Sequence, residues 1–183
     1  MPRTAMQKKI IKEKDEAKLH EFFPDVDSKE LWTRKTHRGF TTLPKTMPLI
    51  MVLMDGLESG QPMSSTYLSL WCLAWDGAFL QIRNEKTLAL ESGFSGERAV
   101  TTWKKRMRLL QQWGFIEARK AEHEFSFVLI INPHIVLEEL KQAGKLKNDE
   151  LFSLLKARDI DLSAGGFTRT HPVPLPAPSE ATA

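Results

Sequence analysis

The fold is decided by residues 86–116, which read KTLALESGFSGERAVTTWKKRMRLLQQWGFI, and by the alternating pattern that follows them. The start of this stretch predicts a short helix over residues 85–91, with the side chain of Asn84 as its N-terminal cap. Gly93 comes next and permits a sharp turn, because glycine adopts positive φ angles at little cost. The remainder predicts a longer helix over about residues 96–113. Two helices joined by such a turn are typical of a helix-turn-helix.

Ser95 is placed to cap the long helix, and Gly114 is placed to end it by taking a positive φ. Residues 115–120 and 125–131 then alternate or run apolar, with four mostly polar residues between them. This pattern predicts a two-stranded hairpin. A helix, a turn, a second helix and a hairpin, in this order, indicate a winged helix-turn-helix in which the hairpin is the wing.

Further elements are expected around this motif. The periodicity and the turn signals predict helices over residues 4–21, 47–57, 64–75, 132–143 and 148–158, and a short strand over residues 79–83. Ser64 or Ser65 is expected to cap the helix over residues 64–75. The sequence therefore predicts a mainly α fold with a small β-hairpin wing, a winged helix-turn-helix with additional N- and C-terminal helices.

Composition divides the chain into three parts. Residues 1–43 hold a charged N-terminal helix and a basic arm, and residues 44–163 form the winged helix-turn-helix domain. Residues 164–183 are rich in proline and have few large apolar groups. This composition predicts a disordered tail, which we expect to be dispensable for folding.

The long helix is amphipathic. Projection at about 100° per residue places Val100, Trp103, Met107 and Leu110 on one face, which we expect to lie in the core. Over residues 95–120, seven basic residues stand against two acidic ones, and this net charge of +5 exceeds the +3 of the whole chain. The positive charge is therefore concentrated on the outer face of the helix and on the wing.

A helix that enters the major groove needs cations for phosphates, and side chains such as Arg, Thr and Gln that read base edges. The basic arm, residues 33–46, has no acidic residue and is expected to lie along phosphates, with a solvated connector as the alternative interpretation. The candidate DNA-binding residues are Arg98, Thr101, Thr102, Lys105 and Arg108 on the helix, Arg119 and Lys120 on the wing, and Arg34, Lys35 and Arg38 on the arm.

This stretch resembles winged-helix proteins of bacterial plasmids and phages, of replication-initiator and regulator types. The resemblance rests on Leu88–Phe94, Arg98–Val100, Leu109-Leu110, Trp113–Ile116 and Val128–Pro133. It implies binding of duplex DNA through the second helix and the wing, in transcriptional regulation or in plasmid or phage replication and maintenance. Initiators of this type often carry a second DNA-binding domain, for which this chain has no room, so a regulator or accessory protein is favoured.

Other classes of function find no support in the sequence. We see no glycine-rich phosphate loop, no catalytic set and no metal-ligand spacing among the five histidines. We therefore expect no enzyme, no cofactor and no metal site. No apolar run is long enough for a membrane span or a signal peptide, which predicts a cytoplasmic protein with double-stranded DNA as its partner.

The aromatic residues and the single cysteine are interpreted as core. Trp71, Trp75, Trp103 and Trp113 have apolar neighbours at helical spacing, and Cys72 lies in an apolar run. One cysteine also excludes an intramolecular disulfide.

Two alternatives for the function and assembly of the chain stay open. The winged helix can be a protein-interaction module without sequence-specific DNA binding, and the chain can act as a homodimer.

Overall fold

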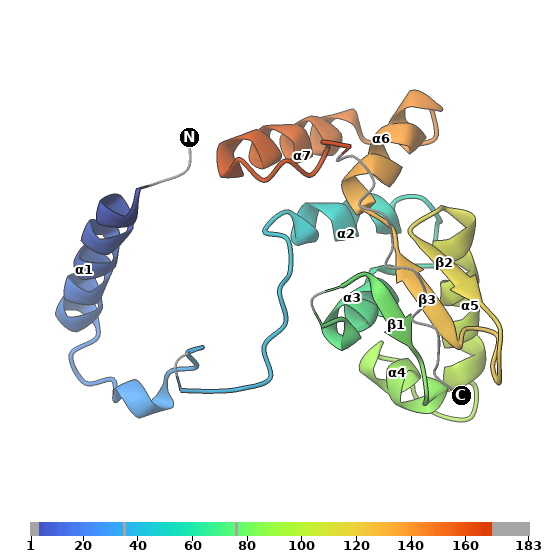
Figure 1. Ribbon diagram of the computed structural model, residues 1–183, viewed down its shortest axis with the longest axis horizontal. Coiled ribbons are helices and arrows are strands. Elements are labelled where there is room, and N and C mark those ends of the chain that lie inside the picture. The colour runs from blue at the N-terminus through green and yellow to red at the C-terminus, as the bar shows by residue number, and fades with distance from the viewer. Residues whose placement is uncertain (1–3, 35, 76, 170–183) are drawn as a thin grey trace, which may run out of the picture.

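The computed structural model describes residues 4–34, 36–75 and 77–169, and it shows a mainly helical body with a small antiparallel sheet (Figure 1). A 3₁₀ turn covers Ser28–Glu30. The helices of this described part are α1 (Ala5–Phe22), α2 (Met47–Asp55), α3 (Ser64–Leu73), α4 (Glu85–Glu91), α5 (Ala99–Gln112), α6 (Pro133–Gln142) and α7 (Asp149–Leu162). The strands are β1 (Phe79–Gln81), β2 (Ile116–Arg119) and β3 (Phe127–Ile130).

The sheet has β3 at its centre, paired antiparallel with both β1 and β2. Leu129 of β3 lies opposite Phe79 of β1. Because side chains alternate along a strand, Leu80 and Val128 point inward and are buried, whereas Phe79 and Leu129 stay exposed on the outer face. The predicted hairpin is therefore confirmed, and β1, which precedes α4 and α5 in the chain, completes the sheet.

The core is formed by the apolar faces of the helices and the inner face of the sheet. Trp103, Met107 and Leu110 of α5 are fully buried, as the helical projection predicted. The ring of Trp103 packs edge-on against Phe125, with the ring centroids 5.8 Å apart. Val100, which we expected on the same face, is only partly buried. Because α5 packs on the core through this one face, its opposite side makes no core contacts.

Asparagine side chains cap three helices, and the sequence predicts two of these caps, those of Asn84 and Asn132. Asn84 Oδ1 accepts a hydrogen bond from the amide of Thr87 at 3.1 Å, and Asn132 Oδ1 accepts one from the amide of His134 at 3.0 Å. Asn148 does the same for α7. These caps are local, because the side-chain oxygen bonds an amide two or three residues away in sequence.

Two helix starts differ from the prediction. α5 begins at Ala99, with Arg98 in the N-cap position and no side-chain cap, because Gly96 takes a φ of +77° that does not continue a helix. The first amides of α3 are bonded by the carboxylate of Asp55, 2.8 Å from both the Met63 and Ser64 nitrogens. Neither Ser95 nor a serine of α3 acts as the cap.

The end of α3 corrects two expectations about buried residues. Trp75 is 89% exposed, and Cys72 is exposed as well. α3 ends at Leu73, so Trp75 lies past the last turn and does not follow the helical periodicity that predicted its burial. Of the other three tryptophans at helical spacing, Trp103 is fully buried, whereas Trp71 and Trp113 are half-buried.

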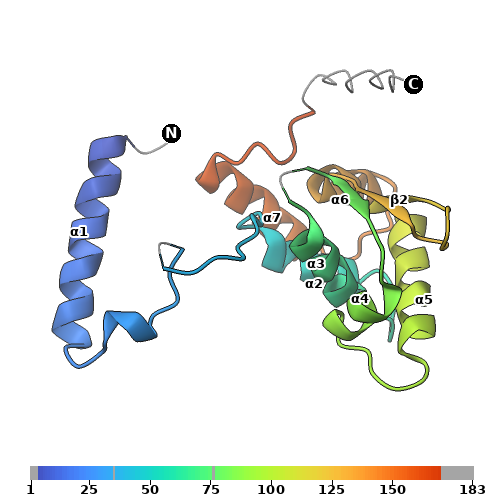
Figure 2. The same cartoon turned by 60° about the horizontal axis from the view of Figure 1, so that its bottom comes forward.

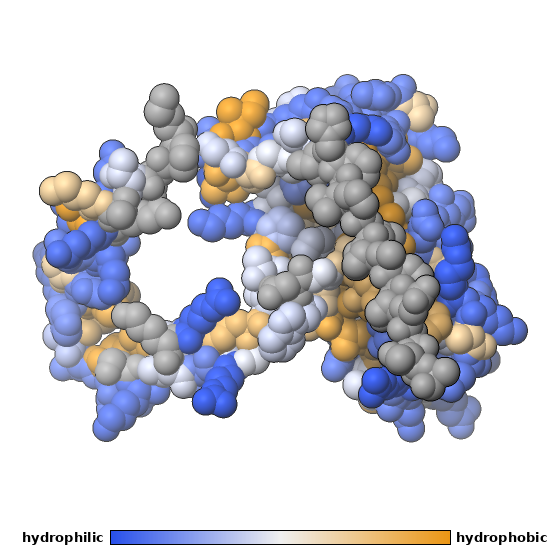
Figure 3. Space-filling view, viewed as in Figure 1, coloured by the Kyte–Doolittle hydropathy of each residue, from blue (hydrophilic) through white to orange (hydrophobic). Residues whose placement is uncertain are grey.

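α1 stands apart from the body in two views of the molecule (Figures 1 and 2). Hydrophilic side chains cover most of it in Figure 3, in agreement with the solvent-exposed helix that we expected. The arm that follows joins the body at Thr41, whose hydroxyl donates to the backbone carbonyls of Trp71 and Ala74 at 3.1 and 3.3 Å. The arm is thus fastened to the C-terminal end of α3.

The segment after α7 corrects the expected start of the disordered tail. Phe167 packs edge-on against the rings of His134 and Phe152, with centroid distances of 5.2 and 6.0 Å. The expectation that the tail is disordered is therefore wrong for residues 164–169, because an aromatic ring there adds to the core. The rest of the predicted tail, residues 170–183, lies outside the described residues.

Replacing Phe167 with alanine is expected to lower the free energy of unfolding by on the order of 2 kcal/mol, because the ring is half-buried between two aromatic neighbours. Urea denaturation of the full chain measures the loss. Phe22→Ala is the matched control, since Phe22 is 67% exposed on α1, and it should stay within about 0.5 kcal/mol of the parent. Equal stability of the two variants would show that Phe167 adds nothing to the fold.

Candidate nucleic-acid interface

α5 and its N-cap carry half of the residues that the sequence assigned to DNA binding. Arg98 stands at the start of the helix, and Thr101 and Lys105 follow along the same side. All three are exposed, whereas Thr102 is half-buried. The side chains of Arg98 and Lys105 make no hydrogen bond or ion pair with the residues that the structure describes. Their donors are therefore free to bind an anion.

Arg108 is bound to the hairpin. Its guanidinium donates two hydrogen bonds to the Glu124 carboxylate, with N···O distances of 2.8 and 2.7 Å. The Arg108 hydrogen bonds hold the pKa of Glu124 below its usual range, because they favour the ionised carboxylate. In this structure Arg108, a predicted DNA-binding residue, thus joins α5 to the tip of the hairpin.

A second ion pair joins α5 to α4, where Lys104 Nζ lies 2.8 Å from the carboxylate of Glu85. A projection of α5 alone places no acidic residue on its outer face. Glu85 and Glu124 are missing from it because they belong to α4 and to the hairpin turn. Extending the count from residues 95–120 to residues 95–126 adds two glutamates and lowers the net charge from +5 to +3. The positive surface is therefore smaller than the helix alone suggested.

Arg119 and Lys120 lie at the end of β2 and are exposed. The guanidinium of Arg119 donates to the carbonyl of Ala118 and lies 3.4 Å from the carboxylate of Glu117. Lys120 is near enough to Glu124 to help lower the pKa of that carboxyl group. Exposed pairs of this kind contribute little free energy, so both cations can turn to a phosphate.

The arm is separated from this surface. Arg34 and Arg38 are exposed, and Lys35 lies outside the described residues. In Figures 1 and 2 the arm leaves the body on the side away from α5. The structure thus brings together the predicted residues of α5 and the hairpin, and it leaves those of the arm apart from them.

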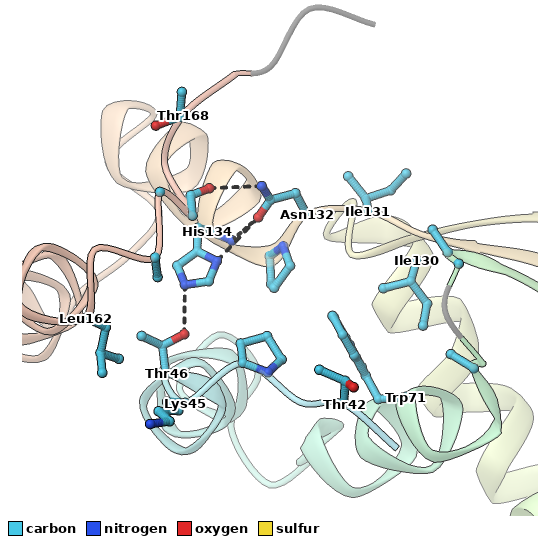
Figure 4. A pocket seen from close by; sticks show the side chains of 18 of the residues that line it. Thr42, Lys45, Thr46, Trp71, Ile130, Ile131, Asn132, His134, Leu162 and Thr168 are labelled. Carbon is cyan, nitrogen blue, oxygen red and sulfur yellow. Dashed lines mark hydrogen bonds between the residues drawn. The ribbon is translucent and has the colours of Figure 1, made fainter. Parts of the chain in front are cut away.

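A pocket of about 820 Å³ lies between the arm, the end of α3, the start of α6 and the segment after α7. Figure 4 shows Trp71 and Ile130 pointing into one end of it, and Thr46 and His134 at the other end. The Thr46 hydroxyl and His134 Nε2 are 2.8 Å apart. The pocket therefore has an apolar end and a polar end.

The side chain of His134 is buried, although histidine is more often a surface residue. Nδ1 lies 3.3 Å from the side-chain oxygen of Asn132, and Nε2 lies 3.9 Å from the carboxylate of Asp159. The same carboxylate accepts a hydrogen bond from the amide of Gly166 at 2.9 Å. The sequence offered no local signal for this cluster, because its members come from three separate segments.

Acid is expected to weaken the fold through His134. Burial lowers the pKa of His134 below its ordinary value of 6.5, although the charge of Asp159 acts in the opposite direction. Since the unfolded chain then binds a proton more readily, stability is full above pH 6.5 and falls as the pH drops from 6.5 toward the lower folded-state pKa. Urea midpoints measured between about pH 8 and about pH 5 should fall less for His134→Gln than for the parent.

The matched control for this pH dependence is His20→Gln, because His20 is exposed on α1. This control should keep the pH dependence of the parent. If His134→Gln loses as much stability in acid as the parent does, a different group causes the loss.

Comparison of the chain with models of protein families, with curated proteins and with solved structures finds no match. Among the described residues, no group of three or more His, Cys, Asp and Glu side chains is placed to hold a metal ion. No helix of the same residues combines the length and the hydropathy that spanning a bilayer requires. The observations that bear on function are therefore the arrangement of the elements and the charges of α5 and the hairpin.

Proposed function

We propose that this chain is a winged helix-turn-helix protein that binds duplex DNA, with α5 in the major groove and the β2–β3 hairpin as its wing. The order α3, β1, α4, α5, β2, β3 supports the proposal, as does the pairing of β1 with β3. So does the turn between α4 and α5, where Gly93 takes a φ of +87°. The elements thus follow each other as the motif requires.

The observation that carries the proposal is the pair of exposed cations on α5, Arg98 and Lys105. They lie on a helix whose opposite face is fixed in the core by Trp103. A helix held in this way presents its side chains to a groove with little loss of conformational freedom. Thr101, between them, adds a hydroxyl that can bond a base edge or a phosphate.

The proposed process is transcriptional regulation, or replication and maintenance of a plasmid or phage. This proposed process rests on the resemblance of residues 88–133 to winged-helix proteins of bacterial plasmids and phages. The proposed location is the cytoplasm, where such DNA lies. A role as regulator or accessory factor is preferred to initiation, because the proposed winged helix uses one DNA-reading helix.

A gel-shift experiment tests the proposal with the full chain and a library of genomic fragments at physiological salt. We expect a discrete complex with some fragments that resists excess non-specific DNA, because base contacts add to the phosphate contacts that all sequences share. Complete displacement by non-specific DNA would limit the function to non-specific binding. No complex with any fragment would contradict the proposal.

The arm is expected to add affinity that does not depend on sequence. Replacing Arg34 and Arg38 with alanine should flatten the plot of log affinity against log salt by roughly one unit for each phosphate that the arm no longer binds. The preferred sequence should stay the same. The matched control replaces Lys147 and Arg158, two exposed cations next to and within α7, and should leave the slope unchanged. An unchanged slope in the arm variant would mean that the arm is only a connector.

A second candidate function is docking of a protein partner, and the outer face of the sheet favours it. Phe79 and Phe127 stack there with ring centroids 5.9 Å apart, and Leu129 is exposed beside them. Exposed apolar groups that gather on one face are typical of protein-interaction surfaces. If the gel shift fails for every fragment, this candidate takes first place.

A further inference from the structure

The described chain ends next to the pocket. Thr168, the last described residue but one, lines the pocket together with Gly165 and Gly166. The side-chain amide of Asn132 donates to the carbonyl of Gly166 at 2.9 Å and holds the segment in this place. In Figure 4, Thr168 lies above His134 at the polar end. Whatever follows Arg169 therefore starts within a few residues of the pocket.

The other end of the pocket is aromatic and apolar. Trp71 and Trp75 line it together with the small side chains of Ala74 and Ala78, and Ile130 faces them from β3. Trp75 is the most exposed large apolar residue in the described part of the chain, at 89%. Hydrophobic residues also reach the surface near α3 and β1 in Figure 3. Clefts lined by aromatic rings are the sites at which proline-rich segments bind.

Residues 172–178 of the same chain read PVPLPAP. Alternation of proline with aliphatic residues favours the polyproline II helix, which is formed before binding and therefore costs little conformational entropy when it binds. This segment carries no charge, so its transfer into an apolar cleft desolvates no ion. Its chemistry is that of a ligand for an aromatic cleft.

We propose that residues 172–178 fold back into the pocket of their own chain, with proline rings on Trp71 and Trp75. A polyproline II helix rises about 3.1 Å per residue, so the four steps from Thr168 to Pro172 span about 12 Å. The chain can therefore extend about this far from the polar end of the pocket toward its apolar end. A pocket of about 820 Å³ has the size of small-ligand sites and takes a few residues of the segment.

Hydrogen-bond donors near the pocket suit this occupant. A polyproline II helix leaves its backbone carbonyls unpaired and, at each proline, has no amide to satisfy. Thr42 and Lys45 line the pocket and supply a hydroxyl and an ammonium group, and Trp75 supplies its indole N–H. These side chains can thus bond the carbonyls, and of the segment only Val173, Leu175 and Ala177 have an amide N–H that needs an acceptor. The site lies apart from the proposed DNA-binding face of α5, and the inference does not depend on that function.

The test compares the indole N–H resonances of the full chain with those of a variant in which Pro172, Pro174, Pro176 and Pro178 are glycine. Trp71→Phe and Trp75→Phe assign the two resonances of the pocket. We expect both to shift in the glycine variant, because the proline rings leave, and we expect the resonance of Trp103 in the core to stay. The matched control, S179G/T182G, changes the same tail beyond the prolines and should leave every indole resonance in place.

Two outcomes would overturn the proposal. If the Trp71 and Trp75 resonances coincide in the parent and the glycine variant, the segment does not occupy the pocket. If the parent resonances move toward those of the glycine variant on about tenfold dilution, a second copy supplies the segment, because an intramolecular contact does not depend on concentration. Trp75→Ala gives the reciprocal check, since the backbone amides of Val173 and Leu175 should then shift.

Discussion

Trp103→Ala is expected to lower the free energy of unfolding by about 3–5 kcal/mol, the largest loss that we predict for a single substitution. Trp103 is fully buried, and its ring contacts Phe125 edge-on. The buried indole nitrogen has no hydrogen-bond partner among the described residues, so the loss comes from packing and not from a broken hydrogen bond. The cavity forms where α5 meets the hairpin, which should loosen the proposed DNA-binding surface as well.

Urea denaturation of the full chain measures this loss, and Trp32→Ala is the matched control. Trp32, just before the arm, is 68% exposed, so its removal should change the free energy of unfolding by no more than about 0.5 kcal/mol. A loss below about 1 kcal/mol for Trp103→Ala would mean that α5 is not anchored by this ring.

Arg98→Ala is expected to weaken binding to the preferred DNA site by about 1–3 kcal/mol and to relax the preference at one base pair. Arg98 stands at the N-terminal end of α5, the end that reaches base edges in helix-turn-helix proteins. Its planar guanidinium can donate to both major-groove acceptors of a guanine. Quantitative gel shifts on the preferred site and its single-base variants measure both effects.

Lys105→Ala is expected to weaken binding to all sequences alike and to lower the salt slope by about one unit, because an ammonium group binds phosphate as a point charge. Arg158→Ala removes the same charge from the exposed side of α7 and should change nothing. Arg98 and Lys105 are exposed, so both variants should melt like the parent. If both variants bind DNA as the parent does, α5 does not read DNA. Docking of a protein partner then becomes the preferred function.

Local signals in the sequence predicted the elements that local contacts form. The asparagine caps of α4 and α6 bond amides within three residues, and Gly114 ends α5 with a φ of +83° as expected. The core face of α5 follows from helical periodicity alone. A short range of sequence contains everything that these features require, and for this reason they could be predicted.

The features that the sequence did not predict depend on residues far apart in the chain. The carboxylate of Asp55 caps a helix that starts nine residues later. Glu124 binds Arg108 across 16 residues. His134 is buried by segments on both sides of α6, and Phe167 packs on it from beyond α7. No period or spacing shows which of these side chains meet.

The paired hydrogen bonds between Arg108 and Glu124 also constrain how the hairpin can vary. Glu124 lies in the turn between β2 and β3, and its reach to α5 depends on the number of residues in that turn. One residue more or fewer would rotate or displace the carboxylate and leave the guanidinium without its bidentate partner. We therefore expect the turn length and the residue at position 108 to change together among related sequences. Homologues with a longer or shorter turn are expected to have lost the arginine as well.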